Sequence, residues 1–374
     1  MRVVHFFKTY LPDTTGGIEQ VIFQLCQGSR ALGVMAEVVT LSPNPHPSGI
    51  QVADHDVWRA KQDFYLASTG FSRQVFQLFR ERVAQADLVH FHFPWPMMDL
   101  VHFATRHGRP SVVTYHSDIV RQSGLLRLYR PLMQHFLADM QGIVVSSPQY
   151  LETSPVLSAY RDKVSVIPFG LDRAAYPDPS EERLAYWRAN VGPKFFLFVG
   201  VLRYYKGLHV LLEALQGLPY PVFIVGSGPE EQALKAQAQR LHLTQVHFLG
   251  RLDDEDKGCL LQLCYAFVFP SPLRSEAFGI SLLEAALYGK PMISCEIGTG
   301  TSFINQNNET GLVINPEDVS ALRQALTYLW DHPVEAQRMG QNAAQRFEQQ
   351  FTASRMCQDT VNLYQNILNK GACS

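Results

Sequence analysis

Short runs of β-branched and aromatic residues alternate with helix-patterned segments through the first half of this chain. Six such runs stand at residues 3–7, 36–41, 87–93, 111–116, 143–146 and 164–167. Alternation of this kind predicts a parallel sheet whose strands are joined by helical crossovers. The first half is therefore expected to form an α/β domain.

The same alternation restarts after a connector rich in proline and charge, with runs at 195–199, 222–225, 246–249, 266–269 and 292–294. A chain of 374 residues has room for two domains of roughly 100 to 200 residues each. We predict two doubly wound Rossmann-like domains, at residues 1–170 and 191–350, joined by a linker at 171–190. Ligands of open α/β sheets lie beyond the carboxyl ends of the strands, so an interdomain cleft between two facing domains is expected.

Composition and cysteine spacing narrow the class of protein. The net charge of −2 argues against a nucleic-acid partner. The six cysteines form no C-x-x-C pair and no His-paired metal spacing, so free thiols in a reducing compartment are expected, without disulfides or zinc. The apolar run at the start is too short for a secretory signal, and no stretch approaches the roughly 20 apolar residues of a membrane span. A cytoplasmic location is expected.

The segment 275–291, SEAFGISLLEAALYGKP, places Glu276 and Glu284 eight residues apart around an expected helix start. Unpaired amides and the positive end of a helix attract a diphosphate. The residues expected in that first turn are Phe278, Gly279, Ile280 and Ser281. Glu284 would lie roughly 7 to 8 Å further along the axis, within reach of a ribose. The alternative is an amphipathic helix with two solvated glutamates.

Two features of the first half also follow predicted strands. Gly16 and Gly17 precede a helical pattern, where glycine permits close approach of the backbone to a diphosphate or sugar. The alternative is a loop that needs a positive φ, and the G-x-G-x-x-G dinucleotide fingerprint is absent. His116 ends a β-rich run and should project from the carboxyl edge of the sheet. The alternative for this residue is a structural histidine.

In the second half, Arg203 and Lys206 come directly after a predicted strand. Two fixed cations there neutralise a diphosphate and stabilise it as a leaving group. The alternative is a pair of solvated surface cations. Gly226 and Ser227 stand in a further strand-to-turn loop, VGSGP, for which a simple turn is the alternative. The acidic run after Leu252 is expected to be a solvated helix start.

The Glu276-x7-Glu284 pattern, its YGKP end, the Gly16–Gly17 turn and the cations after a strand resemble the retaining GT-B glycosyltransferases, a large family that includes bacterial mannosyltransferases. The resemblance implies that the final segment, 351–374, packs back on the first domain as a helix. It also implies that Glu276 and His116 orient the transferred sugar, with Arg203 and Lys206 on the diphosphate.

The same resemblance assigns the remaining contacts with the donor. It places Glu284 on the ribose, the Gly16–Gly17 turn against the phosphates, and the backbone near Leu252 beside the base. Gly226 and Ser227 would line the nucleotide or the sugar. Retention would follow from same-face attack assisted by the leaving phosphate, and a transient covalent intermediate is the alternative.

The stretch CEIGTGTSFINQNNETGLVINPED resembles the corresponding region of O-antigen mannosyl- and rhamnosyltransferases. It implies a GDP-linked donor, GDP-mannose first and GDP-rhamnose second, and a lipid-linked oligosaccharide acceptor. The alternatives are a UDP-sugar transferase, a sugar-nucleotide epimerase, or a non-catalytic nucleotide-sugar-binding protein. A nicotinamide dehydrogenase fits less well without the fingerprint glycines. No metal cofactor is expected, so activity should survive chelation.

Apolar residues and arginines interleave in RQSGLLRLYRPLMQHFLADM. Arg121, Arg127 and Arg130 beside leucines suit an anionic membrane surface or a lipid-phosphate acceptor, and Pro131 is expected to interrupt the helix. The alternative is a core-facing helix with solvated arginines, and the segment 71–83 offers a second candidate with the same two readings. A peripheral position on the inner face of the cell membrane is therefore expected.

Overall fold

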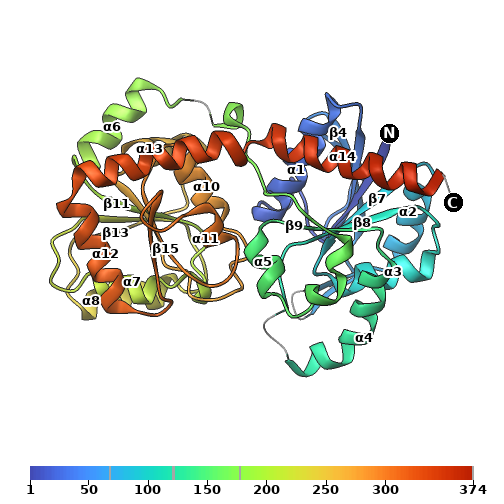
Figure 1. Ribbon diagram of the computed structural model, residues 1–374, viewed down its shortest axis with the longest axis horizontal. Coiled ribbons are helices and arrows are strands. Elements are labelled where there is room, and N and C mark those ends of the chain that lie inside the picture. The colour runs from blue at the N-terminus through green and yellow to red at the C-terminus, as the bar shows by residue number, and fades with distance from the viewer. Residues whose placement is uncertain (67–68, 120–122, 177, 373–374) are drawn as a thin grey trace. The chain divides into compact units, whose positions relative to one another are not determined.

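The computed structural model describes residues 1–66, 69–119, 123–176 and 178–372, and the chain divides into two compact units (Figure 1). The first unit comprises Met1–Gly170 and Ala353–Ser374, and the second comprises Leu171–Thr352. Residues 171–190, expected to be a linker, therefore belong to the second unit. They include most of helix α6 (Glu181–Val191), which buries Trp187 and bonds its indole N–H to Asp256 Oδ1 at 2.7 Å.

The first unit is built on an eight-stranded sheet of order β10-β9-β8-β7-β1-β2-β4-β3, parallel except for the β3–β4 pair. Its strands are β1 (Arg2–Phe6), β2 (Met35–Ser42), β3 (Gly49–Val52), β4 (His55–Lys61), β7 (Leu88–Phe93), β8 (Ser111–Tyr115), β9 (Gly142–Val145) and β10 (Val164–Val166). All six predicted strands of this half are present. The sequence did not predict β3 and β4, nor the separate hairpin of β5 (Phe64–Leu66) and β6 (Thr69–Phe71).

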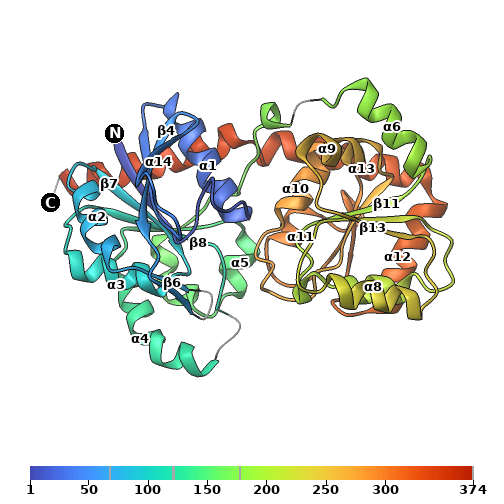
Figure 2. The same cartoon turned by 180° about the vertical axis from the view of Figure 1, so that it is seen from behind.

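Helices cover both faces of this sheet (Figures 1 and 2). They are α1 (Gly17–Arg30), α2 (Gln74–Val83), α3 (Pro96–Thr105), α4 (Ser123–Asp139), α5 (Pro148–Thr153) and α14 (Ala353–Ala372). Successive residues of a strand point to opposite faces, and β7 shows which helices lie on each. His90 contacts Tyr364 of α14, whereas Phe91 packs against Phe79 of α2 and Phe136 of α4.

The C-terminal helix α14 packs against α1 within the first unit. Cys357 Sγ lies 3.4 Å from the carbonyl oxygen of Gln24, and a Cβ built on Gly28 would lie 2.6 Å from the same sulfur. Buried residues at helical spacing form the contact face of α14, among them Met356, Val361 and Tyr364. Glycine at position 28 therefore lets the two helices approach closely.

The second unit contains a six-stranded parallel sheet of order β13-β12-β11-β14-β15-β16. Its strands are β11 (Phe196–Val199), β12 (Val222–Val225), β13 (Val246–Gly250), β14 (Ala266–Phe269), β15 (Met292–Cys295) and β16 (Gly311–Ile314). Its remaining helices are α7 (Leu208–Ala214), α8 (Glu231–Arg240), α9 (Asp254–Leu263), α10 (Ile280–Leu287), α11 (Gly300–Ile304), α12 (Val319–Asp331) and α13 (Pro333–Gln350). The five predicted strands are present, and β16 was not predicted.

Burial explains why four strands of this sheet were easy to recognise. Every residue of β11, β12, β14 and β15 is buried. Parallel strands covered on both faces read as continuous apolar runs, which is the pattern these strands show. The centre of the sheet is therefore the core of the second unit.

The five cysteines among the described residues are buried and free, while Cys373 lies outside the described part of the chain. The described helices include none that is both long enough and apolar enough to span a bilayer.

Candidate active site

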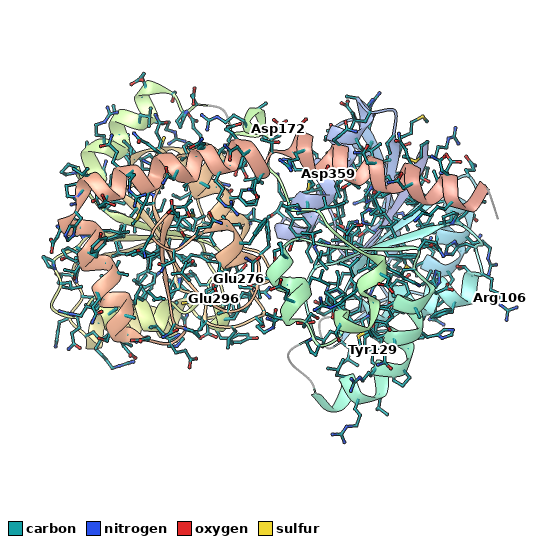
Figure 3. All side chains as sticks on the ribbon, viewed as in Figure 1. Arg106, Tyr129, Asp172, Glu276, Glu296 and Asp359 are labelled. Carbon is teal, nitrogen blue, oxygen red and sulfur yellow. The ribbon has the colours of Figure 1, made fainter. Side chains whose placement is uncertain are left out.

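The strand order of the second unit reverses between β11 and β14, which are neighbours in the sheet but not in the sequence. At such a switch point the loops leaving the carboxyl ends run to opposite sides and leave a place for a ligand. The loop after β11 carries Arg203 and Lys206, and the loop after β14 carries Glu276, which is labelled in Figure 3. Three residues predicted from two separate motifs therefore lie in the loops that follow the two strands flanking this point.

Lys206 and Glu276 form a nearly buried ion pair. Lys206 Nζ lies 2.5 Å from Glu276 Oε2, and the two side chains are only 10% and 11% exposed. The ammonium also lies 4.6 Å from the ring centroid of Phe269. Burial, followed by the nearby Glu276 charge, raises the pKa of Tyr205 to about 12, which keeps that phenol neutral. The charged side chains of Lys206 and Glu276 are therefore held together at the switch point.

Arg203, the other predicted cation, is exposed. It immediately precedes a 3₁₀ turn, η3 (Tyr204–Lys206), and Gly207 follows that turn with φ 69°. A Cβ on Gly207 would lie 2.0 Å from the carbonyl oxygen of Pro270, so the turn packs directly on the loop that follows β14. The two cations consequently differ in setting, with Lys206 fixed on Glu276 and Arg203 left at the surface.

Helix α10 begins one residue later than Gly279, which precedes it with φ 94° and ψ 68°. Phe278 was expected in the first turn, and this expectation is wrong because the left-handed Gly279 separates it from the helix. The Phe278 ring is buried instead, 6.3 Å from the ring of Phe351. Ile280 and Ser281 do occupy the first turn, where backbone amides remain without intrahelical partners.

Glu284 lies on α10 and is 6% exposed. Its Oε1 accepts hydrogen bonds from the Tyr176 hydroxyl and from Lys257 Nζ, both at 3.1 Å. Burial lowers the pKa of Lys257, but the carboxylates of Glu284 and Asp254 outweigh it and raise that pKa above its usual value. The alternative of two solvated glutamates is therefore wrong, since Glu276 and Glu284 are both buried and paired.

The loop after β12 is held by backbone contacts to its neighbours. Gly226 has φ 129°, and a Cβ there would lie 2.0 Å from the carbonyl oxygen of Gly200. The amide of Leu202 donates to the carbonyl of Ser227 at 3.0 Å. Leu252 follows β13 and is half-buried, and the acidic run after it forms the first turn of α9. The prediction of a helix start at this run is confirmed.

His116 follows β8 in the first unit and is 4% exposed. Its Nε2 lies 3.0 Å from His92 Nδ1, and its ring centroid is 5.3 Å from that of Phe169. Burial lowers the pKa of His116 to about 3, so the imidazole is neutral near pH 7. Such a group can offer a hydrogen bond to a sugar hydroxyl without carrying charge.

Gly16 and Gly17 are exposed at the start of α1. Gly16 has φ −154° and ψ 178°, an extended conformation that any residue adopts, so the alternative of a loop that needs positive φ is wrong. A Cβ at Gly16 would instead lie 2.6 Å from Glu19 Oε2. The Thr14 hydroxyl donates to Glu19 Oε1 at 3.0 Å, which fixes that carboxylate beside the turn.

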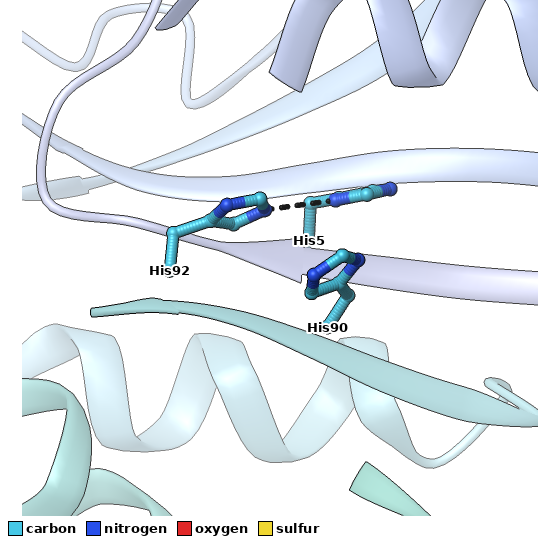
Figure 4. A group of neighbouring side chains, drawn as sticks. All are labelled: His5, His90 and His92. Carbon is cyan, nitrogen blue, oxygen red and sulfur yellow. Dashed lines mark hydrogen bonds between the residues drawn. The ribbon is translucent and has the colours of Figure 1, made fainter. Parts of the chain in front are cut away.

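Sequence reasoning missed three histidines beside His116. Figure 4 shows His5, His90 and His92, whose nitrogens lie within 4.8 Å of one another and are the one group of potential metal ligands found among the described residues. The alternation H-F-H in β7 was the available signal, because residues two apart share a face of a strand.

Helix α4 carries the predicted membrane or acceptor residues. Arg127 and Arg130 are exposed, and Arg121 lies outside the described residues. Pro131 was expected to interrupt the helix, and this is wrong, because α4 continues through it to Asp139. Packing of Phe136 on Phe91 of the sheet compensates for the backbone hydrogen bond that proline lacks.

The second membrane candidate, 71–83, contains helix α2. Its buried residues Val75, Phe79 and Val83 recur at helical spacing and face the sheet. Arg80 is exposed. These contacts match the alternative of a core-facing helix, although only Arg80 is solvated at its end, since Arg82 lies 4.2 Å from the Trp58 ring centroid and 3.9 Å from Glu37.

Comparison with known families covers most of the chain. The family model described as glycosyl transferases group 1 matches residues 180–346, and that described as glycosyltransferase family 4 matches residues 15–175. The D-rhamnosyltransferase WbpZ of Pseudomonas aeruginosa is 62% identical over 94% of this chain and 93% of its own length. The O-antigen chain mannosyltransferase C of Escherichia coli is 50% identical over 98% of this chain and 99% of its own.

Solved structures share the fold at low identity. The sucrose-phosphate synthase of Thermosynechococcus elongatus superposes with a TM-score of 0.81 at 21% identity, covering 99% of both chains. HepE of Anabaena, solved in complex with UDP-glucose, gives 0.77 at 20% identity, covering 98% of this chain and 100% of its own. With a GT-B fold and near-full-length relatives at such identity, the chain belongs to the group 1 glycosyltransferases and is a glycosyltransferase.

Proposed function

We propose that this glycosyltransferase moves mannose or D-rhamnose from GDP to a lipid-linked oligosaccharide in O-antigen synthesis, with retention of the anomeric configuration. The buried Lys206–Glu276 pair at the switch point of the second sheet carries the chemical part of the proposal. Two relatives support the choice of sugar, since one is a D-rhamnosyltransferase and the other an O-antigen mannosyltransferase. The higher identity to the former supports D-rhamnose as a candidate sugar alongside mannose.

In the proposed mechanism the donor diphosphate lies at the free amides of Ile280 and Ser281, where the helix dipole favours negative charge. Lys206 and the exposed Arg203 neutralise the charge that develops as the nucleoside diphosphate leaves. Gly226 and Ser227 line the nucleotide, and Leu252 lies by the base. Glu284 exchanges one of its present donors, Tyr176 or Lys257, for a ribose hydroxyl.

One carboxylate and one imidazole orient the sugar in this proposal. Glu276 accepts a hydrogen bond from a sugar hydroxyl with Oε1, the oxygen that is not paired with Lys206, and neutral His116 contacts another hydroxyl. The Gly16–Gly17 turn brings exposed backbone to the phosphates. The acceptor hydroxyl attacks the face from which the diphosphate departs, and the phosphate takes its proton. No step needs a metal ion.

Donor choice is tested first by binding and then by turnover. Melting of the full chain is measured with GDP, UDP, ADP and NAD in parallel, and GDP alone is expected to raise the melting temperature by several degrees. A ligand at about 100 times its Kd stabilises by roughly 2.7 kcal/mol. Mass spectrometry then follows transfer from GDP-mannose, GDP-D-rhamnose and UDP-glucose to a lipid-linked acceptor, with and without excess chelator.

The outcomes of these two measurements separate the alternatives. Product from UDP-glucose alone would contradict the GDP donor, and conversion of a donor without any acceptor would identify an epimerase. Tight GDP binding without turnover on any acceptor would support a binding protein. Loss of transfer in chelator that magnesium restores would contradict the proposed metal independence.

We also propose that α4 contacts an anionic membrane surface. Arg127 and Arg130 are exposed on this helix, and Leu128 between them is 81% exposed. An exposed leucine flanked by arginines suits the boundary between headgroups and acyl chains. The proposal places the enzyme at the inner face of the cell membrane.

We expect the double variant Arg127→Gln/Arg130→Gln to bind vesicles that contain about 30% phosphatidylserine roughly 30-fold more weakly than the wild-type protein does. Each arginine near an anionic surface contributes about 1 kcal/mol. Arg188→Gln/Arg240→Gln, which neutralises two exposed arginines of the second unit, is the matched control and should bind as wild type. Equal sedimentation of both double variants with the vesicles would contradict the membrane role of α4.

A further inference from the structure

Four buried histidines share one face of the first-unit sheet. His5 lies on β1, His90 and His92 lie on β7, and His116 follows β8, so that they come from three adjacent strands. His5 pairs with His90 in the register of β1 and β7, and His92 pairs with Thr114 in that of β7 and β8. Period-2 alternation then places all four rings on the face that α14 covers.

Three of these rings form a hydrogen-bonded chain that ends at His116. His92 Nε2 lies 3.0 Å from His5 Nδ1, the contact drawn in Figure 4. On its other side, His92 Nδ1 lies 3.0 Å from His116 Nε2. The ring of His92 is 0% exposed and stacks on both neighbours. Among the described residues, none bonds to His116 Nδ1.

Neutrality limits the proton arrangements of this chain to two. Burial lowers the pKa of His5 and of His116 to about 3 and that of His92 well below its usual value. A neutral imidazole has one N–H donor and one acceptor nitrogen. If His5 donates to His92, then His92 donates to His116 and the proton of His116 is on Nδ1. If the direction is reversed, Nε2 of His116 carries the proton and Nδ1 is an acceptor.

The alternative is that this cluster binds a metal ion, and its hydrogen bonds argue against that alternative. A ligating nitrogen must offer its lone pair to the ion. His90 uses both nitrogens, Nδ1 with the Tyr364 hydroxyl at 2.5 Å and Nε2 with Thr114 Oγ1 at 2.7 Å. His92 likewise uses both. Metal binding would therefore break bonds that the folded chain already makes.

We propose that His92 and His5 are positioning residues that fix which nitrogen of His116 carries the proton. They thereby decide whether His116 presents a donor or an acceptor at Nδ1. The kinetic consequence rests on the proposed contact of His116 with the sugar, whereas the tautomer itself does not. A partner of this kind acts as the carboxylate does on a catalytic histidine, through orientation and tautomer.

The tautomer is measured by two-bond proton–nitrogen correlation spectra of the full chain labelled with ¹⁵N-histidine, in which His116→Asn assigns the signals of His116. Wild type is expected to show one tautomer of His116. His92→Phe, which removes both bonds, is expected to give a mixture or the opposite tautomer. His92→Gln keeps a donor and an acceptor, and is expected to retain a single tautomer. His90→Gln is the control for packing, because the His90 ring stacks on His92 at 4.6 Å but forms no hydrogen bond with the three histidines of the chain.

Kinetics then separate positioning from stability. His92→Phe is expected to lower kcat by about 10- to 100-fold, by analogy with the loss of a residue that orients a metal-ligating histidine. His92→Gln should recover most of this loss, and His90→Gln should not reproduce it at equal folded fraction. If His92→Phe does not fold, His5→Phe, which removes the bond to His92, tests the same chain from its far end.

An unchanged His116 tautomer in His92→Phe, or in His5→Phe, would overturn the proposal. One equivalent of Zn²⁺ bound by wild type and lost in His90→Gln would also overturn it. Because the nitrogen spectra require no donor, inactivity with GDP-sugars would contradict the proposed function alone.

Discussion

Lys206→Met is expected to lower kcat by roughly 10² to 10³, the cost of removing one preorganised group that stabilises developing charge. It is also expected to destabilise the fold by about 3 to 5 kcal/mol, since it leaves a buried carboxylate without its partner. Glu276 is that carboxylate, because its Oε2 lies 2.5 Å from Lys206 Nζ and its side chain is only 11% exposed. Initial rates and urea unfolding measure the two effects.

The double variant Lys206→Met/Glu276→Gln separates these effects. It removes both charges, so much of the stability should return, whereas activity should stay low. Lys235→Met is the matched control, because Lys235 and Glu231 form a pair at 2.7 Å whose side chains are 48% and 27% exposed. Its stability should change by no more than about 1 kcal/mol. Wild-type rates in Lys206→Met would refute the role assigned to this residue.

Gly207→Ala is expected to destabilise the protein by several kcal/mol and to abolish most activity. The residue has φ 69°, and a Cβ there would lie 2.0 Å from the carbonyl oxygen of Pro270. Because a Cβ is fixed to the main chain and the oxygen belongs to it, the backbone would have to move to relieve this clash. The strain falls on the turn that holds Lys206 against Glu276. Thermal melting and initial rates, read on the same preparation, test both parts.

Gly217→Ala supplies the matched control, with φ 73° and open space around the added Cβ. This variant should lose only the roughly 1 to 2 kcal/mol of stability that an alanine costs in a left-handed conformation, and it should keep the wild-type kcat. If the two alanine variants lose equal stability, close packing on Pro270 does not determine the need for glycine at position 207.

The strands and the site loops were predictable because local signals carried them. Continuous apolar runs marked the fully buried strands, Arg203 and Lys206 followed directly after one of them, and the two glutamates stood in the segment between two others. Strand β4 escaped notice because polar residues interrupt it, although it alternates buried and exposed positions for most of its length. Pro131 was misjudged because local propensity does not include the packing of Phe136 on the sheet.

The partners of the site residues were not predictable, because they come from distant parts of the chain. Glu276 pairs with Lys206, 70 residues away, and Glu284 accepts from Tyr176, 108 residues away. Phe278 was assigned to the helix because a sequence does not state whether Gly279 has a left-handed conformation. The histidine chain required the order of β1, β7 and β8, which periodicity does not provide.

The C-terminal helix α14 completes the first unit, although 182 residues, Leu171–Thr352, are synthesised between the two parts of that unit. During translation the first-unit sheet therefore emerges without the helix that supplies Tyr364 to His90 and Cys357 to α1. The second unit, continuous in sequence, is complete before α14 leaves the ribosome. The first unit can therefore be completed only after the whole second unit has been synthesised, which reverses the usual order in which the N-terminal domain is finished first.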